Sequence, residues 1–113
     1  MAVQSLELLR GTLDLLILRA LTRGRLHGFA VMRFLEEATG DALQIEEGSL
    51  YPALYRLEDR GWIQSEMGVS ENNRRARFYR LTPKGRAQLK TEVADFRRFV
   101  TAVLQVIEGP AAS

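Results

Sequence analysis

The 113-residue sequence predicts a mainly α-helical chain with one small β-hairpin and a long C-terminal helix. Apolar residues recur with helical spacing before residue 61 and again after Pro83, and between these regions they alternate with polar residues. A chain of this length forms one core rather than two. We therefore expect a domain at residues 1–82, followed by a C-terminal helix and tail at residues 83–113.

The first two helices are marked by caps and breakers. The first is expected after Gly11, with Thr12 as its cap, and it ends before the cluster Thr22-Arg23-Gly24. The second follows His27-Gly28 and stops at Gly40. We assign His27 a packing or capping role rather than a functional one. Between Asp41 and Gly48 the alternation predicts at most a short extended piece.

A third helix is expected to open with Ser49 as its N-cap and to end near Arg60-Gly61. Pro52 would then fall in the first turn, where a missing amide costs nothing. Helical spacing places four apolar residues on one side, namely Leu50, Ala53, Leu54 and Leu57. The opposite side carries Tyr51, Pro52, Tyr55, Arg56 and Asp59. Partial burial is the alternative for the two tyrosines.

Period-two alternation after Gly61 predicts two strands joined by a polar tip at residues 70–75. The paired asparagines Asn72 and Asn73 suit the left-handed backbone that a hairpin loop often requires. Thr82-Pro83 then caps and starts the last helix.

The last helix carries apolar residues at spacings of 4, 3, 4, 3 and 4, which are heptad positions. We expect this stripe to form a homodimer contact through Leu89, Val93, Phe96, Val100, Val103 and Ile107. The alternative is that the helix folds back on the first helix of its own chain. Phe99 and Leu104 widen the apolar face enough for both contacts to coexist.

The net charge of +2 is unevenly distributed. Residues 72–91 hold seven basic residues and no acidic one, whereas the remainder carries a net charge of −5. A solvated hairpin is the simplest alternative, but such a concentration favours a polyanionic partner.

The order of three helices and a hairpin is that of a winged helix, whose third helix enters the major groove of double-stranded DNA. We expect Tyr51, Pro52 and Arg56 near base edges. Phosphate contacts are expected from Ser49, Asn73, Arg74, Arg75 and Arg77, although Ser49 also serves as a cap. A winged helix that binds only proteins is the alternative function.

The sequence also resembles the phenolic acid decarboxylase regulator (PadR) family of bacterial transcription factors. The resemblance runs from Gly11 to Gly85 and rests on four segments: Gly11 to Leu18, Glu47 to Glu58, Arg60 to Ile63, and Arg74 to Thr82. His27-Gly28 stands where the family commonly has Tyr-Gly. The single C-terminal helix is similar to that of the short subgroup.

The resemblance implies a homodimeric repressor that binds a palindromic operator and is released by a small hydrophobic or aromatic effector. In similar regulators the effector stacks on a tryptophan between protomers. Phe96 stands at that position here, which makes Phe96 and Phe99 the candidate effector contacts.

Other function classes receive little support. One histidine, no cysteine, no glycine-rich phosphate loop and no metal-ligand spacing give no basis for an enzyme, a metal site or a cofactor. The longest uncharged stretch, Phe99 to Ile107, is too short to span a membrane. We therefore expect a cytoplasmic protein.

Overall fold

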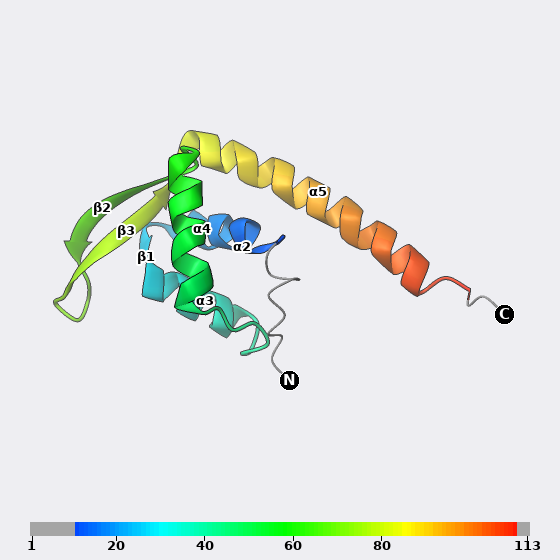
Figure 1. Ribbon diagram of the computed structural model, residues 1–113, viewed down its shortest axis with the longest axis horizontal. Coiled ribbons are helices and arrows are strands. Elements are labelled where there is room, and N and C mark those ends of the chain that lie inside the picture. Colours follow the sequence, from blue (N-terminus) through cyan, green and yellow to red (C-terminus); the bar gives the residue numbers. More distant parts are fainter. Residues whose placement is uncertain (1–10, 111–113) are drawn as a thin grey trace.

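The computed structural model describes residues 11–110. Its elements are α2 (Leu13–Ala20), the 3₁₀ helix η1 (Leu21–Arg23), β1 (Leu26–His27), α3 (Gly28–Ala38), α4 (Glu47–Asp59), β2 (Ile63–Val69), β3 (Arg75–Leu81) and α5 (Pro83–Ile107). The predicted fold class is confirmed. Figure 1 shows α2, α3 and α4 gathered beside the sheet, with α5 extending away from them as a long arm.

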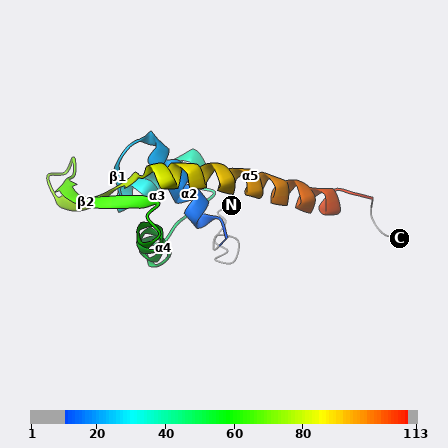
Figure 2. The same ribbon diagram turned by 90° about the horizontal axis from the view of Figure 1, so that it is seen from above.

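The core lies where α2, α3 and α4 meet. The predicted buried face of α4 is confirmed, because Leu50, Ala53, Leu54 and Leu57 are all fully buried. They belong to one cluster with Ile17 and Leu18 of α2 and with Val31 and Leu35 of α3. Burying one such aliphatic side chain stabilises the fold by about 1.5–3 kcal/mol. Seen from above in Figure 2, α4 stands to one side of the line formed by the hairpin and α5.

The start of α4 corrects the sequence prediction. The helix begins at Glu47 with Glu46 as its N-cap, so Ser49 is its third residue and does not cap it. Pro52 is consequently the sixth residue and lies inside the helix rather than in its first turn. At that depth proline removes the amide that would donate to the carbonyl of Gly48.

The sheet has one strand more than the predicted hairpin. β1 pairs antiparallel with β3, which also pairs with β2, giving the order β1-β3-β2. The hairpin register pairs Ile63 with Leu81 and Val69 with Arg75. The predicted left-handed residue in the tip is Asn73, with φ 58°.

The two ends of the hairpin are fixed to the first turn of α5. Thr82 is its N-cap, as predicted: the Thr82 hydroxyl accepts a hydrogen bond from the Gly85 amide at 2.9 Å and donates one to the Gly61 carbonyl at 2.6 Å. Gly85 is itself required here, because a Cβ on it would lie 1.8 Å from the carbonyl oxygen of Trp62. The start of β2, the end of β3 and α5 therefore share one tightly packed junction.

Candidate nucleic-acid interface

The outward face of α4 presents aromatic side chains and one proline. Tyr55 is 75% exposed and Tyr51 is 44% exposed, and Pro52 is exposed beside them. Tyr51 is partly covered because its ring lies over Gly28 at the start of α3, where an added Cβ would come within 2.9 Å of the Tyr51 hydroxyl oxygen. Of the two tyrosines, Tyr55 is therefore the one fully available to a partner.

Arg56 is not free on that face. Its Nη2 donates to Asp14 Oδ1 at 2.6 Å and its Nε donates to Asp14 Oδ2 at 3.4 Å, which makes a two-point contact from α4 to α2. Arg60 Nη1 approaches the same carboxylate at 3.8 Å. The structure thus places Arg56 against α2 instead of leaving it free to reach base edges.

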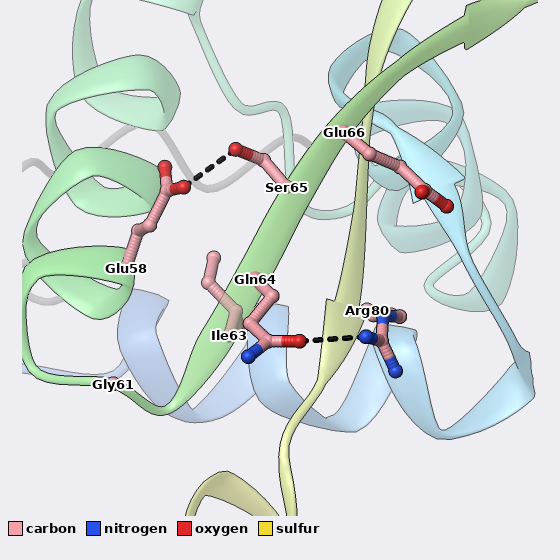
Figure 3. Close-up of a pocket in the computed structure, with 7 residues that line it drawn as sticks. All are labelled: Glu58, Gly61, Ile63, Gln64, Ser65, Glu66 and Arg80. Atoms are coloured by element: carbon pink, nitrogen blue, oxygen red, sulfur yellow. Dashed lines mark hydrogen bonds between the residues drawn. The ribbon is translucent and has the colours of Figure 1, made fainter.

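Arg77 is also engaged. The Ser65 hydroxyl donates to Glu58 Oε2 at 2.5 Å and accepts from Arg77 Nη1 at 3.0 Å, so the three side chains connect the end of α4 to both long strands. Figure 3 shows Glu58 reaching from α4 to Ser65 on β2. Glu58 and Ser65 also line a hollow of about 450 Å³, together with Gln64 and Glu66 of β2 and Arg80 of β3.

Tyr79 of β3 is buried close to Arg77 and Glu58, where the wing meets α4. Burial raises the pKa of its hydroxyl above the ordinary value of 10.0, the positive charge of Arg77 lowers it, and Glu58 and Tyr51 raise it further. A neutral hydroxyl is therefore favoured at this position, which agrees with a packing role for the ring.

We define the wing as β2, β3 and the tip between them, residues 70–74. The tip is closed by hydrogen bonds from the Ser70 amide to the Arg74 carbonyl and from the Asn73 amide to the Ser70 carbonyl, both 2.8 Å. The side chains of Asn73, Arg74 and Arg75 are exposed, and neither arginine forms an ion pair within residues 11–110. The tip and the adjoining first residue of β3 therefore present two guanidinium groups to solvent.

Sequence reasoning missed a second group of arginines. Arg23 and Arg33 line a groove of about 440 Å³ between α3 and the wing tip, together with Phe29, and Glu37 and Glu71 line it as well. Arg25 stacks over the Phe78 ring at 4.3 Å and pairs with Glu66 at 2.7 Å. The sequence does contain a signal for this group, because the stretch between Asp14 and Glu36 holds four arginines and no acidic residue.

The single histidine has the expected capping role. His27 is the N-cap of α3, and its Nδ1 accepts a hydrogen bond from the Ala30 amide at 3.1 Å. Its ring also contacts Phe78 edge-on, with 5.4 Å between centroids. His27 therefore fixes the entrance of α3 against β3.

The apolar stripe of α5 divides into two parts. Leu89 is buried in the core of its own chain and Val93 packs against that core, which is the fold-back contact considered from the sequence. Beyond them Phe96 is 38% exposed and Phe99 is 66% exposed. Val100 is half-buried, and Val103 and Ile107 are exposed. The outer half of the helix therefore leaves a row of apolar side chains uncovered within the described part of the chain.

A groove of about 600 Å³ runs between α2 and the inner half of α5. Leu15, Leu16, Leu89 and Val93 line it, and Arg19, Lys90 and Arg97 give it three basic residues and no acidic one. No helix within residues 11–110 has the length and apolar character that a membrane crossing needs. Over the same range there is no grouping of three potential metal ligands.

Comparisons with known proteins agree with this architecture. Residues 17–91 match the model of the transcriptional regulator PadR-like family. A transcriptional regulator of Mycobacterium tuberculosis is 36% identical over 98 residues, which cover 87% of this chain and 88% of that protein. The negative transcriptional regulator PadR of Bacillus subtilis is 27% identical over 73 residues, or 65% of this chain and 40% of that protein.

Solved structures give the same result. The crystal structure of a PadR family transcriptional regulator from Eggerthella lenta superposes with a TM-score of 0.78 at 31% identity, covering 93% of this chain and 89% of the other. A transcriptional regulator from Clostridium thermocellum gives 0.77 at 29% identity, with 94% and 99% covered. These matches confirm the prediction of a DNA-binding regulator rather than an enzyme. The chain belongs to the PadR-like family of transcriptional regulators.

Proposed function

We propose that the chain is a homodimeric repressor whose two α4 helices bind the half-sites of a palindromic operator, and that a small hydrophobic or aromatic effector releases it. The observation that carries the proposal is the pairing of two unlike surfaces: the exposed Tyr55 and Pro52 on α4, and the exposed guanidinium groups of Arg74 and Arg75 on the wing. The first surface suits base edges and thymine methyl groups, and the second suits phosphates. Such a regulator would act in the cytoplasm.

The outer half of α5 supports the dimer. Phe99, Val103 and Ile107 lie exposed on one helix that extends from a core too small to cover them, and the long axis of the molecule is 61 Å. Burying this row against a second copy would remove an exposed apolar patch. A homodimer would also place two α4 helices in a fixed relation, as half-sites about 34 Å apart require.

Phe96 and Phe99 supply the aromatic faces for an effector at the dimer contact. A flat apolar molecule held there would have to fit one angle between the two α5 helices better than another, because a ligand shifts an equilibrium only by its differential affinity. We test this with a panel of planar aromatic compounds, measuring release of labelled operator. Phe96→Ala should abolish a release that the wild-type protein shows.

The test of DNA recognition is selection from a randomised duplex library at about 0.15 M salt, where sequence-independent binding is weak. We expect enrichment of a palindrome with half-sites one helical turn apart. Enrichment of a single half-site would contradict the dimer. A folded dimer that enriches nothing would contradict operator binding and would favour the protein-interaction alternative.

The test of the dimer is sedimentation of Val103→Glu beside Gln105→Glu. Val103 lies on the apolar row, whereas Gln105 is exposed on the other side of the same helix. Each variant adds one negative charge, so only the position differs. We expect Val103→Glu to sediment as a monomer and Gln105→Glu to remain a dimer. A monomeric wild-type protein would overturn the proposal.

A further inference from the structure

The charge of α4 is opposite to that of the wing. Its thirteen residues include one basic side chain, Arg56, and three acidic ones, Glu47, Glu58 and Asp59. Between Asn72 and Leu81, by contrast, there are four arginines and no acidic residue. If Arg56 is neutralised by another carboxylate, the exposed surface of α4 has no cation with which to attract the DNA backbone.

Asp14 supplies that carboxylate. Both of its oxygens accept from Arg56, at 2.6 Å and 3.4 Å, and only 19% of the Asp14 side chain is exposed against 42% of Arg56. Two-point contacts between a guanidinium and a carboxylate are stronger and more directional than single hydrogen bonds. A phosphate that took Arg56 would leave the half-buried Asp14 carboxylate without this partner, close to the negative DNA. The exchange is therefore unfavourable.

Asp14 also fixes α4 in place. It lies in the first turn of α2, where a negative charge is favourable. It pairs with Arg56 of α4 and with Arg60, the C-cap residue one turn later. The contact joins residues 42 positions apart in sequence. On the other side of α4, Glu58 is held by Ser65. The helix is thus fastened along both of its edges while the face with Tyr55 stays open.

We propose that Asp14 is a positioning residue that determines specificity: it withholds Arg56 from the phosphates, so that α4 distinguishes sequences without adding affinity for every sequence. This inference rests on the DNA binding proposed above. A free cation on α4 would strengthen binding to operator and random DNA alike, whereas a restrained one leaves discrimination to Tyr55 and Pro52. Asp14 therefore acts through Arg56 and need not touch DNA itself.

The experiment measures affinity for the selected operator and for a random duplex of equal length over a series of salt concentrations. Each additional phosphate contact makes the slope of log K against log salt steeper by about 0.9, which corresponds to about fivefold tighter binding at 0.15 M salt. For Asp14→Asn we expect this steeper slope, tighter binding to random DNA, and a lower ratio of operator to random affinity. A merely structural role would not steepen the slope.

Three further variants keep the test decisive. Arg56→Gln should leave the slope unchanged, whereas Arg75→Gln, the matched wing variant, should make it shallower by about 0.9. The double variant Asp14→Asn/Arg56→Gln should return the slope to the wild-type value, because the released cation is gone. Thermal melting of each variant checks that it is folded.

The opposing outcomes are distinct. If Arg56→Gln lowers the slope as Arg75→Gln does, Arg56 contacts phosphate in the complex and the inference is overturned while operator binding stands. If Asp14→Asn is folded and has the wild-type slope and specificity ratio, Asp14 is only structural. If wild-type protein does not prefer the operator, the proposed function and this inference are both wrong.

Discussion

The helix α4 and the wing are neighbours that differ in which of their charged side chains are paired and which are exposed. Arg56 and Glu58 of α4 are held by Asp14 and Ser65. The residues that α4 leaves open are Tyr55 and Pro52 in its middle and the carboxylates Glu47 and Asp59 at its two ends. The wing tip does the reverse, because its backbone is closed by hydrogen bonds while the side chains of Arg74 and of the adjoining Arg75 are exposed and form no ion pair within the described residues. The difference teaches that sequence discrimination and general attraction to DNA can reside on separate elements. Each can then be altered alone.

Both elements nevertheless depend on one junction. The Gly61 carbonyl just after α4 accepts from Thr82, and the Thr82 amide donates to the carbonyl of Trp62 just before β2 at 3.1 Å. The first turn of α5 closes this junction through Gly85. Changes at the junction should therefore affect α4 and the wing together, whereas changes farther out should separate them.

The largest effect is expected from Gly85→Ala. The added methyl group would have to displace the Trp62 carbonyl, 1.8 Å away, so the free energy of unfolding should fall by about 3 kcal/mol or more. Urea unfolding followed by the fluorescence of Trp62, the single tryptophan, measures the loss. Gly48→Ala is the matched control, because a Cβ at that exposed helical position meets nothing within 4 Å. Equal stability of the two variants would contradict the role given to the junction.

The next effect separates the wing from α4. Arg74→Ala/Arg75→Ala should make the slope of log K against log salt shallower by about 1.8, and should weaken binding at 0.15 M salt about thirtyfold for operator and random DNA alike. Filter binding or fluorescence anisotropy over a salt series gives both quantities. Arg98→Ala is the control, since Arg98 is exposed on α5 far from the wing and pairs with Asp95. A change confined to operator DNA would show that the wing also reads sequence.

A smaller effect, on sequence preference rather than on the salt slope, is expected from Tyr55→Ala. Removing this exposed ring should lower the ratio of operator to random affinity about tenfold, the scale of a single good base contact, and leave the salt slope unchanged. The same binding series measures it, and Tyr55→Phe shows whether the ring or the hydroxyl matters. A shallower slope for Tyr55→Ala would mean that α4 contributes to general attraction after all.

The elements of the fold were largely predictable because their signals are local. Thr82-Pro83 marks the start of α5 within two residues, and the alternation after Gly61 marks the hairpin. The start of α4 was predicted three residues late because Ser49 is the better cap by residue type, yet the N-cap of the helix is Glu46. β1 was not predicted because a strand of two residues is too short to show an alternating pattern. It is recognised as a strand only through its pairing with β3.

The candidate site was predictable as a set of residues but not as a set of contacts. Arg74 and Arg75 are exposed, as a basic tip predicts. Arg56 and Arg77 look the same in sequence, but their partners lie 42 and 12 positions away. The packing of α4 against α2 brings Arg56 to Asp14, and the pairing of β3 with β2 brings Arg77 to Ser65. Spacing along one helix or strand carries no information about such pairs.

The smallest expected effect concerns the seam between α4 and the wing at Tyr79. Because burial raises the pKa of Tyr79 above its unfolded value of 10.0, the folded state retains the proton more strongly than the unfolded chain. The stabilisation is therefore fully present below about pH 10 and is lost as the pH rises through the folded pKa. Urea unfolding at a series of alkaline pH values should show that the free energy of unfolding falls as the pH rises. The fall should be smaller in Tyr79→Phe.

Arg77 tunes this titration, since its positive charge lowers the pKa of Tyr79 while Glu58 raises it. Arg77→Gln should move the pKa of Tyr79 further up, and Glu58→Gln should move it down, in ring-labelled tyrosine NMR spectra assigned with Tyr79→Phe. The opposite shifts are a sharp check because both side chains meet at Ser65. If neither variant changed the pKa of Tyr79, Arg77 and Glu58 would lie apart from Tyr79 in solution. The wing would then not be held to α4 through these three residues.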